Sequence, residues 1–160
     1  MDYKASLDTT ATVITGAIFL LFFYFATSAV RAHLNGHTTV MHYTVSALLF
    51  FLLISVCYVY STRSYSVRNG KLIIHRIAGD KSIDLREIAS ARLMDGSEGG
   101  IRTFGVGGLF GYFGWFRLDA MGSVELHATR GDRRVLIELK NGKRFVISPD
   151  DTGIIRQLQA

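Results

Sequence analysis

Two long stretches without a formal charge constrain this chain more than any other feature of its sequence. The first covers the 22 residues between Asp8 and Arg31, and the second covers the 31 residues between Arg31 and Arg63. A helix of about 20 apolar residues crosses the roughly 30 Å hydrocarbon core of a bilayer, because it satisfies its backbone hydrogen-bonding groups internally. The sequence therefore predicts two transmembrane helices, at about residues 10–30 and 40–60.

A cleaved signal peptide is the alternative explanation of the first stretch. Signal peptides begin with a basic segment, and their apolar stretch is about 7–15 residues long. In this chain one Lys and two Asp precede the first apolar stretch, which is longer than that of a signal peptide. These features favour a helix that stays in the membrane.

The charge distribution predicts how the two helices are oriented. Residues 1–60 have no net charge, whereas residues 61–160 contain 16 Lys or Arg and 11 Asp or Glu. The connecting residues 32–39 are few and contain an Asn-Gly pair, so we expect antiparallel helices. Several basic residues follow the second helix closely, against Arg31 alone near the connection. Because basic segments stay on the cytoplasmic side, both termini and the C-terminal part are expected in the cytoplasm.

The C-terminal part has the pattern of a small β domain. Short β-branched and aromatic runs alternate with turn residues, which is typical of a barrel or sandwich. The pairs Asn69-Gly70 and Asn141-Gly142 predict two-residue type I′ hairpins, since these turns need positive φ at both central positions. The opposite residues expected from these hairpins are Val67 with Leu72 and Ile137 with Val146. Further strands are expected near residues 82–85, 88–94, 115–118 and 123–128.

The last residues predict a helix of about 10 residues that closes the β domain. Ser148 is expected to cap it, Pro149 suits its first turn, and the Asp150 and Asp151 carboxylates suit the positive end of the helix dipole. A helix this short must pack on the sheet to persist. We therefore expect a bent antiparallel sheet of about six or seven strands, closed by this helix.

Three segments of the β domain carry a family resemblance. They are Ile83–Ile88 (IDLREI), Phe104–Gly114 (FGVGGLFGYFG) and Phe145–Asp150 (FVISPD). Together they resemble the bacterial pleckstrin-homology-like domains over about residues 62–159. The resemblance implies a mainly β split barrel with a C-terminal helix, in a family often tethered to transmembrane helices. The expected domains are a transmembrane hairpin at 1–62 and the barrel at 63–160, in a bacterial inner membrane. A fold by itself implies no activity.

The glycine-aromatic segment at residues 99–122 is the main functional candidate. It contains eight glycines, and its 14 uncharged residues at 103–116 are too few to span a bilayer. Phe110 stands where a dinucleotide motif requires glycine, so a phosphate cradle is not expected. Three interpretations stay open: rings that fill the barrel, rings at headgroup depth, or an apolar patch that binds a partner. The aromatic residues concerned are Phe104, Phe110, Tyr112, Phe113, Trp115 and Phe116.

A group of basic residues is the second candidate for membrane contact. They lie in or beside two loops that we expect to be close in space, and each would contribute about 1 kcal/mol near anionic headgroups. Alternatively, they only discourage pairing of strand edges with other chains. The residues are Arg130, Arg133, Arg134, Lys140, Lys143 and Arg144. Nucleic-acid binding is not expected, because acidic residues are interspersed among them.

Patterns typical of catalysis or metal binding are weak. Three histidines near the helix connection fit a polar turn better than a metal site, because the Asn-Gly pair breaks the helical spacing. Cys57 is expected to be a small buried residue, and His75 and His127 are isolated. The three histidines are His33, His37 and His42. We therefore expect no enzymatic activity, cofactor, metal or small-molecule substrate.

These observations predict an integral membrane protein that presents a cytoplasmic pleckstrin-homology-like domain as a binding or scaffolding module at the membrane face. The expected partners are the lipid bilayer and either another membrane protein or a second copy of the chain. The alternative is a structural subunit of a larger membrane protein complex. A transporter or channel is disfavoured, because the two spans contain no formal charge to mark an ion path.

Overall fold

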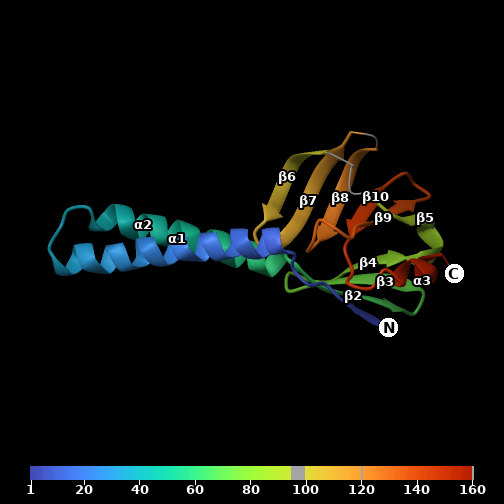
Figure 1. The fold of residues 1–160 in the computed structure, drawn as a ribbon, viewed down its shortest axis with the longest axis horizontal. Coiled ribbons are helices and arrows are strands. Elements are labelled where there is room, and N and C mark those ends of the chain that lie inside the picture. Colours follow the sequence, from blue (N-terminus) through green and yellow to red (C-terminus); the bar gives the residue numbers. More distant parts are fainter. Residues whose placement is uncertain (95–99, 120, 160) are drawn as a thin grey trace.

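The computed structural model describes residues 1–94, 100–119 and 121–159 of the chain. A long pair of antiparallel helices extends from one end of a β domain (Figure 1). The helices are α1 (Thr9–Leu34) and α2 (Val40–Tyr60). Both are long and apolar enough to cross a membrane. Only 6% of an apolar stretch of 18 residues in each helix is buried inside the protein. A core helix of a soluble protein would be mostly buried, so these exposed apolar surfaces fit a lipid environment.

Aromatic side chains pack the two helices against each other. The rings of Phe25 and Phe50 stack with their centroids 5.4 Å apart, and the centroids of Phe22 and Phe51 are 6.3 Å apart. The turn between the helices contains Gly36 at φ 66°, a conformation that glycine adopts at little cost. The predicted helical hairpin is therefore confirmed.

Two sheets pack against each other in the β domain (Figure 1). The first has the strand order β1-β2-β3-β4, and the second has the order β5-β9-β10-β8-β7-β6. Helix α3 (Ile154–Leu158) follows the last strand and contacts β5. The strands are β1 (Asp2–Lys4), β2 (Thr62–Arg68), β3 (Lys71–Arg76), β4 (Lys81–Asp84), β5 (Ile88–Leu93), β6 (Gly100–Gly108), β7 (Gly111–Leu118), β8 (Gly122–Ala128), β9 (Val135–Leu139) and β10 (Arg144–Ile147).

The main core of the β domain contains side chains from both sheets. Its fully buried residues include Tyr65, Leu72, Ile74, Ile137 and Ile147. The hydroxyl of Tyr65 links β2 to the second sheet, because it donates to the His127 carbonyl at 2.6 Å and accepts from the Ser148 N–H at 3.1 Å. Burial raises the pKa of Tyr65 to about 12, so this hydroxyl stays protonated and both bonds persist at neutral pH.

The first predicted hairpin is confirmed. Asn69 and Gly70 have φ values of 51° and 71°, which is the type I′ geometry expected of this pair. Val67 lies opposite Leu72, as predicted. Here two residues with the right turn chemistry were enough to determine the local register.

The second predicted hairpin is wrong in its turn and register. Lys140, Asn141 and Gly142 form a three-residue loop, closed by a 2.8 Å bond from the Leu139 N–H to the Lys143 carbonyl. Only Gly142 has positive φ, at 81°, as in a type I turn followed by a glycine bulge. The extra residue shifts the pairing by one position. The residues observed opposite each other are Ile137 with Phe145 and Leu136 with Val146.

The predicted start of the C-terminal helix is also wrong. Ser148 is buried, and its Oγ accepts the Thr129 N–H at 2.7 Å instead of capping a helix. The Asp150 carboxylate accepts two hydrogen bonds from Ser6, at 3.2 Å from its N–H and 2.6 Å from its hydroxyl. These tertiary contacts keep residues 148–150 out of the helix, so α3 begins only at Ile154 and has five residues.

The described residues of the β domain form more strands than predicted, divided between a four-stranded and a six-stranded sheet, and β8 and β10 are parallel to each other. Neither β1 nor β6 was expected from the sequence pattern. Strand β1 pairs with β2, so the first residues of the chain join the β domain in spite of the expected division at residue 62. Strand β6 is rich in glycine, a residue that is rare in strands, so its sequence lacks the β-branched and aromatic pattern typical of a strand.

Candidate functional site

Strands β6 and β7 form a hairpin from the glycine-aromatic segment. A two-residue turn, Leu109-Phe110, joins the paired Gly108 and Gly111. Further along, Gly105 lies opposite Gly114, and a Cβ atom at either position would overlap the backbone of the other strand. These two glycines therefore allow the strands to approach closely. Gly99 and Ala120 of the predicted segment lie outside the described residues.

The tip of this hairpin packs on both long helices. The Phe110 ring meets Phe19 of α1 edge-on at 6.1 Å between centroids and Tyr58 of α2 at 5.4 Å. The Thr15 hydroxyl of α1 accepts the Phe110 N–H at 3.0 Å. Leu109 beside it is buried. The β6–β7 tip therefore contacts the helix pair at the end where the helices meet the β domain (Figure 1).

Asp8 provides a second link between the helices and the β domain. One carboxylate oxygen accepts the Ala11 N–H at 2.7 Å and caps α1. The other accepts the Gly131 N–H at 2.8 Å and the Tyr112 hydroxyl at 3.2 Å. The first turn of α1 is thus bonded to the loop between β8 and β9. Hydrogen bonds to a charged group are among the stronger ones in proteins.

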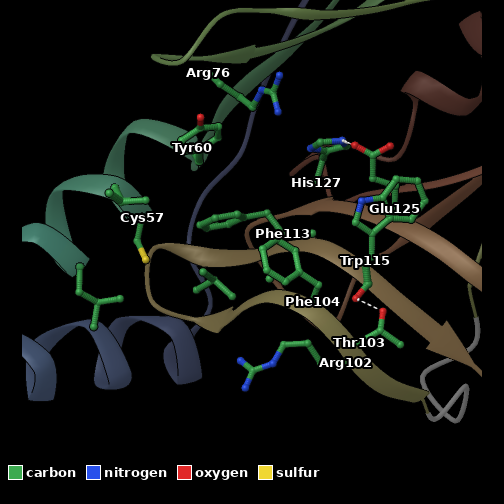
Figure 2. Close-up of a pocket in the computed structure, with 15 residues that line it drawn as sticks. Cys57, Tyr60, Arg76, Arg102, Thr103, Phe104, Phe113, Trp115, Glu125 and His127 are labelled. Carbon is green, nitrogen blue, oxygen red and sulfur yellow. Dashed lines mark hydrogen bonds and ion pairs between the residues drawn. The ribbon is translucent and has the colours of Figure 1, made fainter.

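A groove of about 740 Å³ lies between the end of α2 and the second sheet. Its α2 wall includes Val56, Cys57 and Tyr60. Phe113 and Trp115 of β7 form the facing wall, together with residues of β6 (Figure 2). Most of this lining is apolar, and the volume lies within the roughly 300–1,000 Å³ that is usual for small-molecule sites.

One end of the groove is polar. Glu125 Oε1 accepts hydrogen bonds from Lys81 Nζ at 2.5 Å and from His127 Nε2 at 2.9 Å. Burial alone would raise the pKa of Glu125, but these two bonds outweigh it and lower the pKa to about 2. Burial lowers the pKa of His127, and the charges of Lys81 and Arg76 add to this effect against the opposing influence of Glu125. The carboxylate is therefore ionised and the imidazole neutral at pH 7.

The neutral imidazole leaves one nitrogen unsatisfied. Nε2 donates its proton to Glu125, so His127 Nδ1 is an acceptor. It is buried and has no hydrogen-bond partner among the residues that the structure describes. In Figure 2 it lies on the side of the ring facing away from Glu125. An unsatisfied buried acceptor is costly, by about 1–3 kcal/mol.

The six aromatic residues predicted as contacts occupy three different environments. Phe104 and Trp115 are 78% and 49% exposed, and with Phe113 they line the groove. Phe110 lies at the β6–β7 tip between the helices. The other two serve the β domain itself, since Tyr112 binds Asp8 and Phe116 packs on a second cluster of buried side chains.

The basic residues predicted as headgroup contacts are not brought together. The two loops lie at opposite ends of β9, whose five residues span about 16 Å. Arg133 and Arg134 belong to one loop, Lys140 and Lys143 belong to the other, and Arg144 lies on β10. Arg144 Nε donates to Glu138 at 2.8 Å, and Arg134 Nε donates to the Gly131 carbonyl at 3.0 Å.

Other basic residues lie at the groove, and the sequence analysis did not single them out for it. Arg76 and Arg102 line it from opposite sides (Figure 2). The Arg102 side chain forms no hydrogen bond or ion pair with any residue in the described ranges. Nothing in the sequence pattern links these two arginines with His127, because sheet pairing brings together residues far apart in the chain. Among the described residues there is no group of three His, Cys, Asp or Glu side chains that could hold a metal ion.

Comparison with known proteins places the β domain in a family. The family model described as "Bacterial PH domain" matches residues 63–159, which is more than half of the chain. No curated protein and no solved structure matches the chain. The matched range begins in β2 and ends just after α3, so it coincides with the β domain apart from β1. The chain belongs to the bacterial PH domain family.

Proposed function

We propose that this chain is an integral membrane protein whose helix pair holds the PH domain against the cytoplasmic face of a bacterial inner membrane. The packing of the β6–β7 tip on both helices carries this proposal. A domain connected only by a flexible linker would not need Phe110 wedged between α1 and α2. The domain serves there as a binding or scaffolding module rather than as an enzyme.

The pairing of the strand before α1 with the strand after α2 supports a location of both termini on the same side of the membrane. Strand β1 precedes α1, β2 follows α2, and the two strands pair with Asp2 opposite Ser66 and Lys4 opposite Ser64. The segment before α1 and the PH domain therefore lie on the same side of any membrane that the helices cross. The excess of basic residues in the domain favours the cytoplasmic side.

Cysteine labelling from either side of the membrane tests this proposal. Asn35→Cys places a thiol in the turn between the helices, and Gln157→Cys places one in α3, both in a Cys57→Ser background. In cells whose inner membrane is intact and whose periplasm is accessible to the reagent, a maleimide that cannot cross the inner membrane should label the first variant only. The second should react only after the membrane is permeabilised. The opposite pattern, or release of the protein by alkaline carbonate, would contradict the proposal.

A structural role in a larger membrane complex is the second candidate. It is favoured by exposed apolar side chains on the β6–β7 hairpin, where Ile101 is 71% and Phe104 is 78% exposed. Such side chains on a domain surface mark contact with a membrane or a protein. Mild detergent extraction separates the two roles, because a complex subunit should be recovered with one partner in fixed stoichiometry.

A further inference from the structure

The groove between the end of α2 and the second sheet adjoins the C-terminal end of the second candidate span. Its α2 wall contains Leu53, Val56 and Cys57, which belong to the last two turns of the candidate span. Where the helices cross a membrane, the exposed side chains of Leu53 and Val56 face acyl chains close to the headgroups. The molecules that reach this groove most directly are therefore the lipids beside α2, whereas a protein segment would have to enter the bilayer to reach Leu53.

The lining of the groove changes from apolar to charged along its length. The aliphatic side chains of α2 and the rings of Phe104 and Phe113 suit a hydrocarbon chain. Arg76 and Arg102 add positive charge at the edges, and the only carboxylate among the described lining residues, Glu125, is already bonded to Lys81 and His127. Because Lys81 balances Glu125, Arg76 leaves a net positive charge at the polar end, and Arg102 adds a second positive charge on the opposite side of the opening.

The two arginines keep most of their hydrogen-bonding capacity free. Arg76 Nε donates to the Gly79 carbonyl at 3.1 Å, and its terminal nitrogens have no hydrogen bond to any described residue. The Arg102 guanidinium has none at all within the described ranges. Arginine binds phosphate well, because its planar fork of N–H groups matches the phosphate oxygens.

We infer that this groove holds one anionic phospholipid of the surrounding bilayer. One acyl chain lies between α2 and the β6–β7 hairpin, and the phosphate lies at the polar end near Arg76, with Arg102 on the other side of the opening. The inference rests on the proposed membrane location of the chain. It adds a defined lipid site, formed jointly by a spanning helix and the PH domain.

Native mass spectrometry of the full chain tests the site. The protein is released from nanodiscs containing equal amounts of phosphatidylglycerol and phosphatidylcholine, and the retained lipids are counted. We expect one phosphatidylglycerol on the unmodified chain. Arg76→Gln should weaken retention about fivefold, the effect of roughly one headgroup contact, and Arg102→Gln, across the opening from the phosphate, should weaken it less. Arg156→Gln, an exposed arginine on α3 far from the groove, is the matched control and should change nothing.

A second pair of variants tests the acyl part of the site. Val56→Trp fills the groove from α2, and Val45→Trp places the same ring on the same helix near its other end. The two valines are similarly exposed, at 47% and 45%. We expect Val56→Trp to abolish retention of the lipid and Val45→Trp to leave it unchanged. Equal retention in both variants, or equal retention of both lipids, would overturn the inference.

Photochemical cross-linking gives a readout that needs no variant. Phosphatidylglycerol with a photoreactive acyl chain should attach to the segment Thr103–Arg117, which trypsin releases intact. Attachment to α1 and α2 alone, or a second copy of the chain held in place of a lipid, would contradict the site. If the protein proves not to be membrane-integral, the proposed function fails as well. If it is integral but retains no lipid, only this inference fails.

Discussion

Replacement of Asp8 by alanine is the sharpest test of the link between α1 and the PH domain. The substitution removes the carboxylate that accepts the Gly131 N–H at 2.8 Å and the Tyr112 hydroxyl at 3.2 Å. Hydrogen bonds to charged groups contribute about 1.5–3 kcal/mol each. Since Asp8 is only half-buried, the lower value applies to both bonds, and we expect the free energy of unfolding of the domain to fall by about 3 kcal/mol.

The assay is urea unfolding of the full chain in detergent micelles. Trp115 is the only tryptophan of the sequence and lies on β7, so its fluorescence reports on the PH domain. For a domain of this size, with a urea dependence of about 1.5 kcal/mol per M, the midpoint should fall by about 2 M.

Asp2→Ala is the matched control for this prediction. Asp2 pairs with Arg68 at 2.6 Å, but both side chains are about 60% exposed. An ion pair this exposed contributes about 0–1 kcal/mol. If Asp8→Ala lowers the stability no more than Asp2→Ala, the carboxylate does not connect α1 to the domain, and the reasoning is refuted.

Three further predictions use the same urea assay. Gly114→Ala should unfold or strongly destabilise the domain, because a Cβ there overlaps the Phe104 carbonyl, whereas Gly16→Ala, with open space around it, should be harmless. Phe110→Ala should lower the free energy of unfolding by about 2 kcal/mol, because a half-buried ring loses its contacts with both helices. Phe104→Ala should change it little, because that ring is 78% exposed. The pKa of Glu125 is about 2 in the folded protein, against 4.5 for an unperturbed glutamate. The ionised carboxylate therefore adds about 3 kcal/mol to the free energy of unfolding. This contribution is complete above pH 4.5 and is lost as the pH falls toward 2. Glu125→Gln should remove this part of the pH dependence, and an unchanged curve would refute the assignment.

Features that depend on a few neighbouring residues could be predicted from the sequence. The two apolar helices followed from length and charge alone, and Asn69-Gly70 determined its own hairpin. The same dipeptide at Asn141-Gly142 gave a different loop, because the register of the whole strand pair decides which loop length fits. The turn residues therefore predicted that a hairpin exists, but not its register.

Features that depend on tertiary contacts could not be predicted. Ser148 has the sequence context of a helix cap, yet its hydroxyl satisfies two backbone N–H groups at the end of β8, those of Thr129 and Arg130. The groove joins α2, β3, β6, β7 and β8, and its charged residues Arg76, Arg102 and Glu125 come from three separate strands. Only the aromatic residues that line the groove from β6 and β7, Phe104, Phe113 and Trp115, had a local pattern that could be recognised.

The depth of Trp115 in a bilayer tests most directly whether the PH domain lies against the membrane face. The unmodified chain is reconstituted into vesicles whose phospholipids are brominated near the headgroup end of the acyl chain. Because Trp115 lines the groove beside α2, we expect these lipids to quench its fluorescence strongly. Lipids brominated near the methyl end of the acyl chain should quench it less. Fluorescence that no brominated lipid changes, but that aqueous iodide quenches fully, would place the domain away from the bilayer and contradict the account.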